Sequence, residues 1–477
     1  MHDLPQLITY ADRLAGDIDG VRRLLDGPLD GAFGGVHLLP FYVPIDGSDA
    51  GFDPIDHTAV DPRLGDWTDV TRLGDGRRVM ADLIVNHVSR DSMPFRDWLA
   101  HGDESAFADL FITPENVFGS VPTPAQLGTI YRPRPTPVVH DVEFADGSVR
   151  SVWSTFTHDQ IDIDVESDAG WQYLSTILDR FAASGIELVR LDAVGYAIKR
   201  AGTSCFMIPE TYAFIDRLAG AARSRGMDVL VEIHGYHRDQ LDIAARVDRV
   251  YDFALPPLVI DALTTGDDTP LRRWIAMRPA NSVNVLDTHD GIGVIDVGVD
   301  QRDPMRSGLL APDRIDALVE GIHDRSNGAS RLATGAAASN LDLYQVNCTF
   351  HDALGRDDAR HLAARLIQVM LPGIAQVYYV GLLGGTNDLD LLARSGVGRD
   401  VNRHHFTGDE VDTALDSDFS RALVDLLCWR STHRAFGGSF ELVDAPAGSL
   451  RMRWTNGDSI VDREIDLTTA TVTIHAD

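Results

Sequence analysis

Cysteine is scarce in this chain of 477 residues, which contains only Cys205, Cys348 and Cys428. Three widely spaced cysteines exclude a disulfide framework, and their spacing matches no zinc-binding motif. No His-Glu-x-x-His motif is present either, so we expect no metal site. A reducing compartment suits such a chain, because structural disulfides are rare there.

Positive charge is also scarce. The chain has 42 Lys and Arg residues against 72 Asp and Glu residues, which gives a net charge of −30 and a pI of about 4.8. Lys199 is the single lysine. A surface this acidic argues against nucleic acid or an anionic membrane as a partner. An anionic substrate would therefore need a local cluster of arginine side chains.

Long hydrophobic runs are missing as well. No stretch approaches the roughly 18 apolar residues of a membrane span. Residues 1–14 have neither the basic start nor the apolar core of a signal peptide. We therefore expect a soluble cytoplasmic protein. The hydrophobic content of 44% is still enough for a large core with one or two additional small domains.

What the sequence does contain is a series of short apolar runs separated by helical patterns such as 170–183, 209–225 and 359–370. Alternating strands and helices indicate βαβ units and a parallel sheet. Eight such units predict an α/β fold, a (β/α)8 TIM barrel. A doubly wound open sheet is the alternative, but no Gly-rich phosphate loop follows an early strand. The predicted strands are Gln6–Tyr10, Gly35–Phe41, Val79–His87, Ile186–Asp192, Asp228–His234, Arg249–Leu255, Ser282–Asp290 and Ile374–Gly381.

Two gaps between predicted strands are too long for ordinary loops, and they follow strands 3 and 7. We predict a small inserted domain in each gap, overhanging the active face of the barrel. After about residue 435, short alternating segments predict a C-terminal antiparallel β domain. The predicted boundaries are 1–86, 168–291 and 356–435 for the barrel, 87–167 and 292–355 for the insertions, and 436–477 for the C-terminal domain.

The stretch Ile186–Tyr196, reading IELVRLDAVGY, joins an apolar strand to charge at its carboxyl end. Barrel enzymes place their chemistry at this end. Arg190 and Asp192 are two residues apart and point the same way, so we expect the arginine to lower the pKa of Asp192 and keep it ionised. An ionised carboxylate in a cleft can be a nucleophile. A structural Arg–Asp pair that closes the strand is the alternative.

More acids and histidines follow other predicted strands. Strand 3 ends at His87, strand 5 delivers Glu232, and strand 7 delivers His289 and Asp290. Burying this much charge without a function is costly. Two carboxyls about 5–5.5 Å apart cleave glycosides with retention. Asp192 suits attack, and Glu232, whose pKa we expect burial to raise, suits acid/base work. Asp290 would stabilise the positive charge of the transition state, and the histidines would bind sugar hydroxyls.

These residues stand in four stretches that resemble the signature regions of the α-amylase family of glycoside hydrolases: DLIVNH at 82–87, RLDAVGY at 190–196, VEIH at 231–234 and VLDTHD at 285–290. Within that family the chain closely resembles the sucrose phosphorylase subfamily. The resemblance runs from about Gln6 to about Trp429. Its most specific stretches are DGSDAGFDPIDH at 46–57, IYRPRP at 130–135, AGTSCFM at 201–207, TGAAASNLDLYQVN at 334–347 and GRDVNRHHF at 398–406.

The resemblance implies retaining glucosyl transfer from sucrose to inorganic phosphate, giving α-D-glucose 1-phosphate and D-fructose. It implies Asp192 as the nucleophile, Glu232 as the general acid/base and Asp290 as the transition-state stabiliser. It implies no organic cofactor, since phosphate is a co-substrate, and it makes a homodimer plausible. The glucosyl-binding residues that it implies are Asp49, Phe52, His87, Arg190, His289 and Arg399. The other substrate-binding residues, chiefly on the acceptor side, are Arg134, Gln160, Tyr196, His234, Asp342, Leu343, Tyr344 and Gln345.

Phosphate is an anion and would enter a site lined by carboxylates. We expect Arg132 and Arg134, on one Pro-rich loop, to supply the positive charge that offsets this repulsion. A solvated basic turn is the alternative for this loop. For the function, the alternatives are a related phosphorylase with a sugar phosphate, glycerol or glycerate as acceptor, a hydrolase or transglucosidase of the same family, and an inactive sugar-binding protein.

Overall fold

A closed barrel of eight parallel strands forms the centre of the computed structural model, which describes residues 3–47, 49–132, 136–335 and 345–477. Each strand pairs with the next barrel strand along the chain, and the last pairs with the first. The predicted (β/α)8 barrel and its eight strands are confirmed. The strands are β1 (Gln6–Thr9), β2 (Gly35–Leu38), β5 (Arg78–Ile84), β10 (Leu188–Asp192), β11 (Asp228–Val231), β12 (Arg249–Asp252), β13 (Ser282–Asn284) and β16 (Ile374–Tyr378).

The barrel strands are apolar on both faces because each strand separates two cores. Alternate side chains point into the barrel, where Met80, Leu188 and Leu230 belong to one buried cluster. The remaining side chains pack beneath the surrounding helices in a larger core. Asp82 lies two residues after Met80 on β5, and Arg190 lies two residues after Leu188 on β10. The two are paired in the register and also point inward. The barrel interior therefore changes from apolar to charged toward its carboxyl end.

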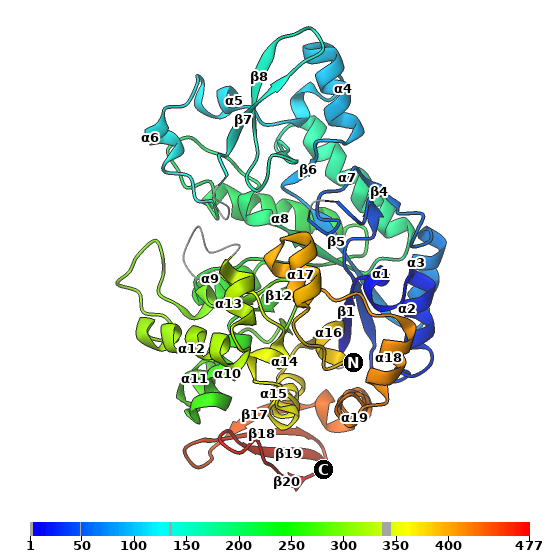
Figure 1. The fold of residues 1–477 in the computed structure, drawn as a ribbon, viewed down its shortest axis with the longest axis vertical. Helices are drawn as coiled ribbons and strands as arrows, with labels where there is room; N and C mark the ends of the chain where they lie inside the picture. The colour runs from blue at the N-terminus through cyan, green and yellow to red at the C-terminus, as the bar shows by residue number, and fades with distance from the viewer. Residues whose placement is uncertain (1–2, 48, 133–135, 336–344) are drawn as a thin grey trace.

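Many of the helices begin where a side chain accepts from a free N–H of the first turn, or where proline lacks that N–H. The Ser167 hydroxyl accepts from the Gly170 N–H at the start of α7, and Pro209 opens α8, where a missing N–H costs nothing. The three predicted helices are confirmed with ends shifted by at most two residues. No helix in the described ranges is both long and apolar enough to cross a bilayer. Those packed around the barrel (Figure 1) are α2 (Ile18–Leu25), α3 (Trp67–Leu73), α7 (Asp168–Ala183), α8 (Pro209–Arg223), α9 (His237–Ala244), α10 (Leu255–Thr265), α11 (Thr269–Met277), α15 (Asp358–Met370) and α19 (Asp418–Thr432).

The segment after β5 forms the upper part of the molecule in Figure 1. It is attached to the barrel through the antiparallel pair β6 (His87–Ser89) and β9 (Gln160–Asp162). The segment after β13 is shorter and closes on itself through the antiparallel pair β14 (Ile292–Gly293) and β15 (Gln345–Val346). Both follow carboxyl ends of barrel strands, as expected, while the predicted domain boundaries stay predictions. Their other elements are α4 (Met93–His101), α5 (Pro114–Phe118), α6 (Pro124–Leu127), β7 (Val139–Glu143), β8 (Val149–Trp153), α12 (Pro312–Arg325), α13 (Ala329–Gly335) and α14 (Phe350–Ala353).

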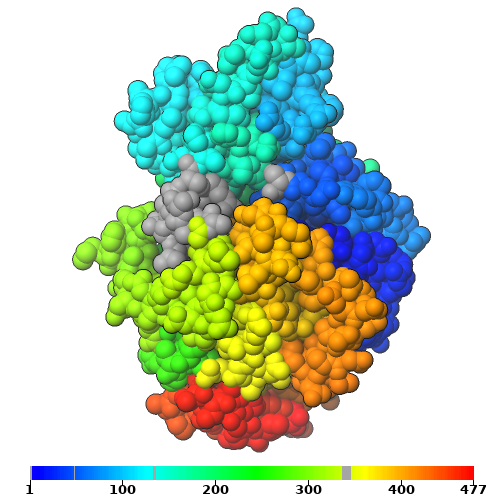
Figure 2. Space-filling model, viewed as in Figure 1, coloured from blue at the N-terminus to red at the C-terminus, as the bar shows by residue number. Residues whose placement is uncertain are grey.

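A four-stranded antiparallel sheet ends the chain, on the side of the molecule opposite α4 and α6 (Figures 1 and 2). Leu450, Met452 and Trp454 line its buried face, and the Trp454 indole N–H donates to the Met370 carbonyl at 2.6 Å. The predicted C-terminal β domain is confirmed and lies away from the barrel mouth. Its strands are β17 (Ser439–Val443), β18 (Ser449–Asn456), β19 (Ser459–Asp466) and β20 (Val472–Ala476). The shorter elements elsewhere include α1 (Ala11–Leu14), β3 (Tyr42–Val43), β4 (Asp56–Val60), α16 (Tyr379–Leu382), α17 (Leu389–Ser395) and α18 (Gly408–Leu415).

Candidate active site

Two carboxyl side chains point into the barrel mouth from adjacent strands. Asp192 ends β10, and Glu232 directly follows β11. The Glu232 N–H donates to the Leu191 carbonyl at 3.3 Å, which continues the register and sets Glu232 beside Asp192. Adjacent strands are about 4.8 Å apart. Ala193 turns the chain with a left-handed φ of 54°, and its N–H donates to Glu232 Oε2 at 3.2 Å. The turn after β10 thus ties the two carboxyls together.

The predicted ends of all barrel strands except strand 4 lie too far along the chain, among them those of strands 3 and 7. β5 ends at Ile84, so His87 lies in β6, and β13 ends at Asn284, so Asp290 lies on a loop. The apolar pattern continued past both ends because Val85 and Leu286 are buried without being in the sheet. These segments turn over the barrel mouth, where burial persists after the strand pairing has stopped.

Asp290 reaches the same mouth from this loop. A carboxylate oxygen of Glu232, a carboxylate oxygen of Asp290 and a ring nitrogen of His234 all lie within 4.8 Å of one another. Arg399 Nη1 lies 2.7 Å and Arg403 Nη2 3.9 Å from Asp290 Oδ1. Burial alone would raise the pKa of Asp290, but the arginines hold it far below its ordinary value. Asp290 is therefore a fixed negative charge beside Glu232. The predicted absence of a metal stays a prediction.

Arg190 connects the acids of the mouth. Its side chain is only 2% exposed, and its Nη1 donates to Asp82 Oδ1 at 2.5 Å and to Asp192 Oδ1 at 2.8 Å. Its Nη2 lies 4.0 Å from Glu232 Oε2. Burial would raise the pKa of Asp82, but His37 at 2.9 Å and Arg190 lower it to about 2. One buried guanidinium thus compensates several carboxylates.

The pKa of Asp192 lies well above its ordinary value, which contradicts the prediction from sequence. Burial is the largest cause, and the charges of Glu232, Asp82 and Asp290 add to it, while Arg190 opposes them. The prediction included the arginine but not the desolvation. The raised pKa means that Asp192 holds a proton more firmly than a solvated carboxyl would.

The predicted glucosyl-binding residues gather beside these acids. The rings of Phe52 and His289 stack with centroids 4.8 Å apart, and the Arg190 guanidinium lies 5.5 Å from the Phe52 ring centroid. The Asp49 carbonyl accepts from the Phe52 N–H at 3.0 Å, which places Asp49 in the same turn. Burial lowers the pKa of His289 to about 3, so this imidazole is neutral at pH 7.

His87 and Gln160 also meet, because β6 pairs with β9. His87 Nε2 lies 3.1 Å from Gln160 Nε2 and 2.9 Å from the Phe52 carbonyl oxygen. Burial lowers the pKa of His87, so it is a neutral hydrogen-bonding group like His289. Both are suited to sugar hydroxyls, which need neutral donors and acceptors.

Part of the predicted acceptor side is described and part is not. Tyr196 packs against Phe156 and Phe206, with ring centroids at 5.3 and 4.7 Å. Gln345 Nε2 lies 3.2 Å from His234 Nε2, which joins β15 to the loop after β11. Arg132, on the Pro-rich loop, donates to the Thr136 carbonyl at 2.7 Å. The predicted residues that lie outside the described ranges are Arg134, Asp342, Leu343 and Tyr344.

Sequence reasoning missed the role of Lys199. Its buried Nζ donates to Asn86 Oδ1 at 2.6 Å and to the Tyr196 carbonyl at 2.7 Å, and it lies 2.7 Å from Asp162 Oδ2. The lysine therefore fastens the loop that carries Tyr196 to the strands that carry His87. Its being the single lysine among 42 basic residues was the signal in the sequence that could have pointed to it.

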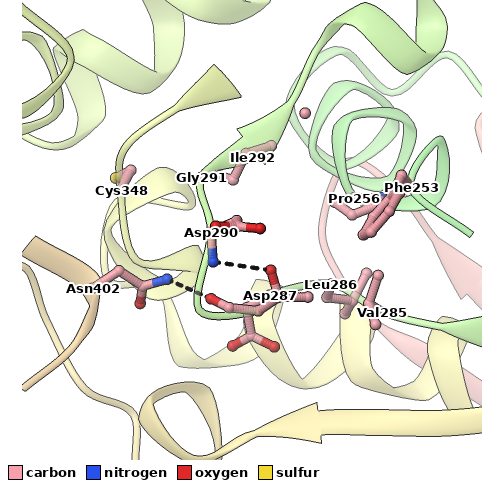
Figure 3. A pocket seen from close by; sticks show the side chains of 12 residues that line it. Phe253, Pro256, Val285, Leu286, Asp287, Asp290, Gly291, Ile292, Cys348 and Asn402 are labelled. Atoms are coloured by element: carbon pink, nitrogen blue, oxygen red, sulfur yellow. Dashed lines mark hydrogen bonds between the residues drawn. The ribbon is translucent and has the colours of Figure 1, made fainter. Parts of the chain in front are cut away.

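A small cavity lies behind Asp290 (Figure 3). Asp287, Asn402 and Cys348 are among its lining residues, and its volume of about 10 Å³ holds no more than a water molecule. The Asp290 N–H donates to Thr288 Oγ1 at 3.2 Å, and Asn402 Nδ2 donates to the Thr288 carbonyl at 2.9 Å. These bonds fix the backbone next to Asp290. The cavity itself is too small to hold a sugar.

Comparisons with known proteins agree with this geometry. Residues 9–239 match the family model "Alpha amylase, catalytic domain". A sucrose phosphorylase from Agrobacterium vitis is 57% identical over 477 residues, which cover 100% of this chain and 97% of that protein. The chain belongs to the sucrose phosphorylase family. It is therefore an enzyme of the glycosyltransferase class, built on the α-amylase TIM barrel.

Two further relatives support the sucrose phosphorylase family assignment. A sucrose phosphorylase from Bifidobacterium adolescentis is 50% identical over 456 residues, covering 95% of this chain and 90% of that protein. The crystal structure of sucrose 6F-phosphate phosphorylase from Thermoanaerobacter thermosaccharolyticum superimposes with a TM-score of 0.91 at 35% identity, covering 99% of this chain and 95% of that one. The family thus includes enzymes whose names state different sugar substrates.

Proposed function

We propose that this protein transfers glucose from sucrose to inorganic phosphate with retention, giving α-D-glucose 1-phosphate and D-fructose. The observation that carries the proposal is the pair Asp192 and Glu232 on adjacent strand ends, both beside the Arg190 guanidinium. Adjacent strands lie about 4.8 Å apart, which supports the roughly 5–5.5 Å carboxyl separation of retaining enzymes rather than the wider spacing of inverting ones.

In the first step Asp192 attacks the anomeric carbon of the glucosyl unit and fructose leaves. Arg190 donates to Asp192 at 2.8 Å but lies 4.0 Å from Glu232. This asymmetry supports Asp192 as the carboxylate that attacks and Glu232 as the acid that donates a proton. Glu232 then gives that proton to the leaving fructose oxygen. Asp290, held ionised by Arg399, stabilises the positive charge that develops on the sugar ring.

In the second step phosphate opens the covalent glucosyl-enzyme. A phosphate oxygen attacks the anomeric carbon, Asp192 leaves as a carboxylate, and the phosphate proton passes to Glu232, which restores the starting state. The anion needs positive charge at this mouth. His234 is the described group best placed to supply it, and Arg134 remains a predicted one. No organic cofactor enters the scheme. A homodimer in the cytoplasm stays a prediction.

The test is sucrose consumption with and without phosphate, followed by product analysis. We expect glucose 1-phosphate and fructose in equal amounts, and free glucose only slowly when phosphate is absent. A rate and a product set that do not depend on phosphate would contradict the proposal and favour a hydrolase. The reverse reaction, with glucose 1-phosphate and fructose, fructose 6-phosphate, glycerol or glycerate, separates sucrose phosphorolysis from the related phosphorylases. Fructose is expected to be the best acceptor.

A further inference from the structure

Asp296 is a buried carboxylate that no step of the proposed reaction uses. It is 0% exposed, in the short turn η4 (Ile295–Val297) that follows β14. Its Oδ2 lies 2.9 Å from His234 Nδ1, while its Oδ1 accepts from the Gly235 N–H at 3.0 Å and from Gln240 Nε2 at 3.1 Å. A buried charge survives only where such partners compensate it. Here one of the partners is an imidazole of the barrel mouth.

The surroundings clamp this imidazole in one orientation. The rings of His234 and Phe253 stack with centroids 3.8 Å apart and an interplanar angle of 16°. Gly293 leaves the room for the contact, because a Cβ there would lie 2.5 Å from Asp296 Oδ2 and 3.0 Å from His234 Nδ1. With Nδ1 held by Asp296, the other ring nitrogen, Nε2, lies beside the side-chain amide of Gln345 at the predicted acceptor side, and an imidazolium N–H there would donate to the oxygen of that amide.

We propose that Asp296 is a positioning residue that keeps His234 as an imidazolium cation and thereby makes it the group that binds the anionic acceptor. The proposal rests on the proposed function and deepens it. A neutral acceptor such as water or glycerol has no need of this charge, whereas phosphate must approach Glu232 and Asp290. The Asp296–His234 pair would therefore favour transfer to phosphate over hydrolysis.

The charged groups that face His234 are acidic from several sides. Glu232 lies two residues before it, Asp290 is on the loop after β13, and Asp296 is behind the ring, while Phe253 and Gln345 are uncharged. Burial lowers the pKa of His234, but these carboxylates outweigh burial and leave the pKa above its ordinary value of 6.5. The cation is thus present below the raised pKa and is lost as the pH rises through it.

Asp296→Asn tests the proposal, because asparagine keeps the shape but removes the charge. We expect the KM for phosphate at pH 7 to rise about 10- to 100-fold, the range set by one charge-assisted hydrogen bond. The upper pH limit of tight phosphate binding is expected to shift to lower pH, since His234 loses its counter-charge. Sucrose hydrolysis without phosphate and transfer to glycerol are expected to change less than about threefold. Phosphate itself also changes its charge with pH, but this change is the same for the native enzyme and the variant, so it does not affect the difference between their pH profiles.

Asp300→Asn is the matched control. Asp300 is also buried on this segment, but its partners are Arg302 and Arg306. The Asp300→Asn substitution should leave the KM for phosphate and the pH dependence of that KM unchanged. Asp296→Glu, which restores the charge, should recover part of the phosphate affinity and also covers the case in which the asparagine variant does not fold.

Two outcomes would overturn the inference. One is an unchanged KM for phosphate in Asp296→Asn with the pH dependence of the native enzyme. The other is an equal fall of phosphorolysis, hydrolysis and transfer to glycerol, which would mean a general structural role. If the native enzyme itself ignores phosphate, the proposed function fails instead. The two failures are therefore told apart by the unmodified protein alone.

Discussion

Replacing Asp192 with asparagine is expected to lower the rate of sucrose phosphorolysis by at least about 10⁴-fold, as loss of a catalytic group typically does. Asparagine is nearly isosteric, but it cannot form the ester to glucose. Initial rates of glucose 1-phosphate formation give the measurement. In a complementary experiment with α-D-glucosyl fluoride, whose leaving group needs no protonation, Glu232→Gln should retain the nucleophile and lack the acid/base, so a mass increase of one glucosyl unit should be found on the fragment containing Asp192. Residual activity near that of the native enzyme in Asp192→Asn would contradict a covalent role.

Stability provides the internal control for this variant. A carboxyl with a raised pKa in the native state binds its proton more tightly there than in the unfolded chain. Stability is therefore lost as the pH rises from the unfolded pKa of about 4 toward the raised folded pKa, and above the folded pKa the loss is complete and constant. Removing the charge at pH 7 should leave the Tm of Asp192→Asn equal to or above that of the native enzyme. A lower Tm would show that the loss of activity includes damage to the fold.

Asp252→Asn is the matched comparison. Asp252 ends β12 as Asp192 ends β10, but its carboxylate lies in the outer core, where it accepts from Trp274 Nε1 at 2.8 Å and from Arg278 Nε at 2.6 Å. We expect Asp252→Asn to lower the Tm and to retain most of the activity. Two aspartates at the ends of the barrel strands on either side of β11 would then show opposite effects, which separates a catalytic carboxylate from a structural one.

The barrel was predictable because its strands must be apolar on both faces. Runs such as residues 186–192 carry that signal without any tertiary information, and residues before the strand end, such as Arg190, could be assigned by alternation. The ends of β5 and β13 could not, because Val85 and Leu286 are buried against the mouth rather than paired. The apolar pattern of a sequence reports which residues are buried. After β5 and β13 the residues stay buried although they no longer pair with a neighbouring strand.

The electrostatics of the site were less predictable than its residues. The pKa of Asp192 depends on desolvation and on Glu232 and Asp290, which are distant in sequence. The pair of His234 with Asp296 likewise joins two loops that sequence spacing does not connect. The resemblance to a family supplied the set of site residues. The direction of a pKa shift could not be predicted from that set, because it depends on the distances between the charged groups. Three-dimensional proximity decides which of several acids carries the proton.

Replacing Arg190 with leucine is expected to destabilise the protein by about 3–5 kcal/mol, the usual cost of leaving a buried charge without its partner. Asp82 is 0% exposed and, among the described residues, would keep His37 as its hydrogen-bonded partner. Activity should also fall by at least about 10²-fold, because the guanidinium would no longer favour the negative charge on Asp192 over Glu232. Denaturant unfolding at pH 7 measures the first effect and phosphorolysis rates the second.

The double variant Asp82→Asn/Arg190→Leu decides whether this interpretation is right. If the cost of Arg190→Leu comes from the uncompensated charge of Asp82, removing that charge should restore a large part of the lost stability, while the activity should stay low because Asp192 still lacks its donor. Stability losses that simply add would mean that Arg190 supports the barrel by packing against Phe52 and Tyr251 instead. The same guanidinium would then have separate structural and catalytic roles rather than one electrostatic role.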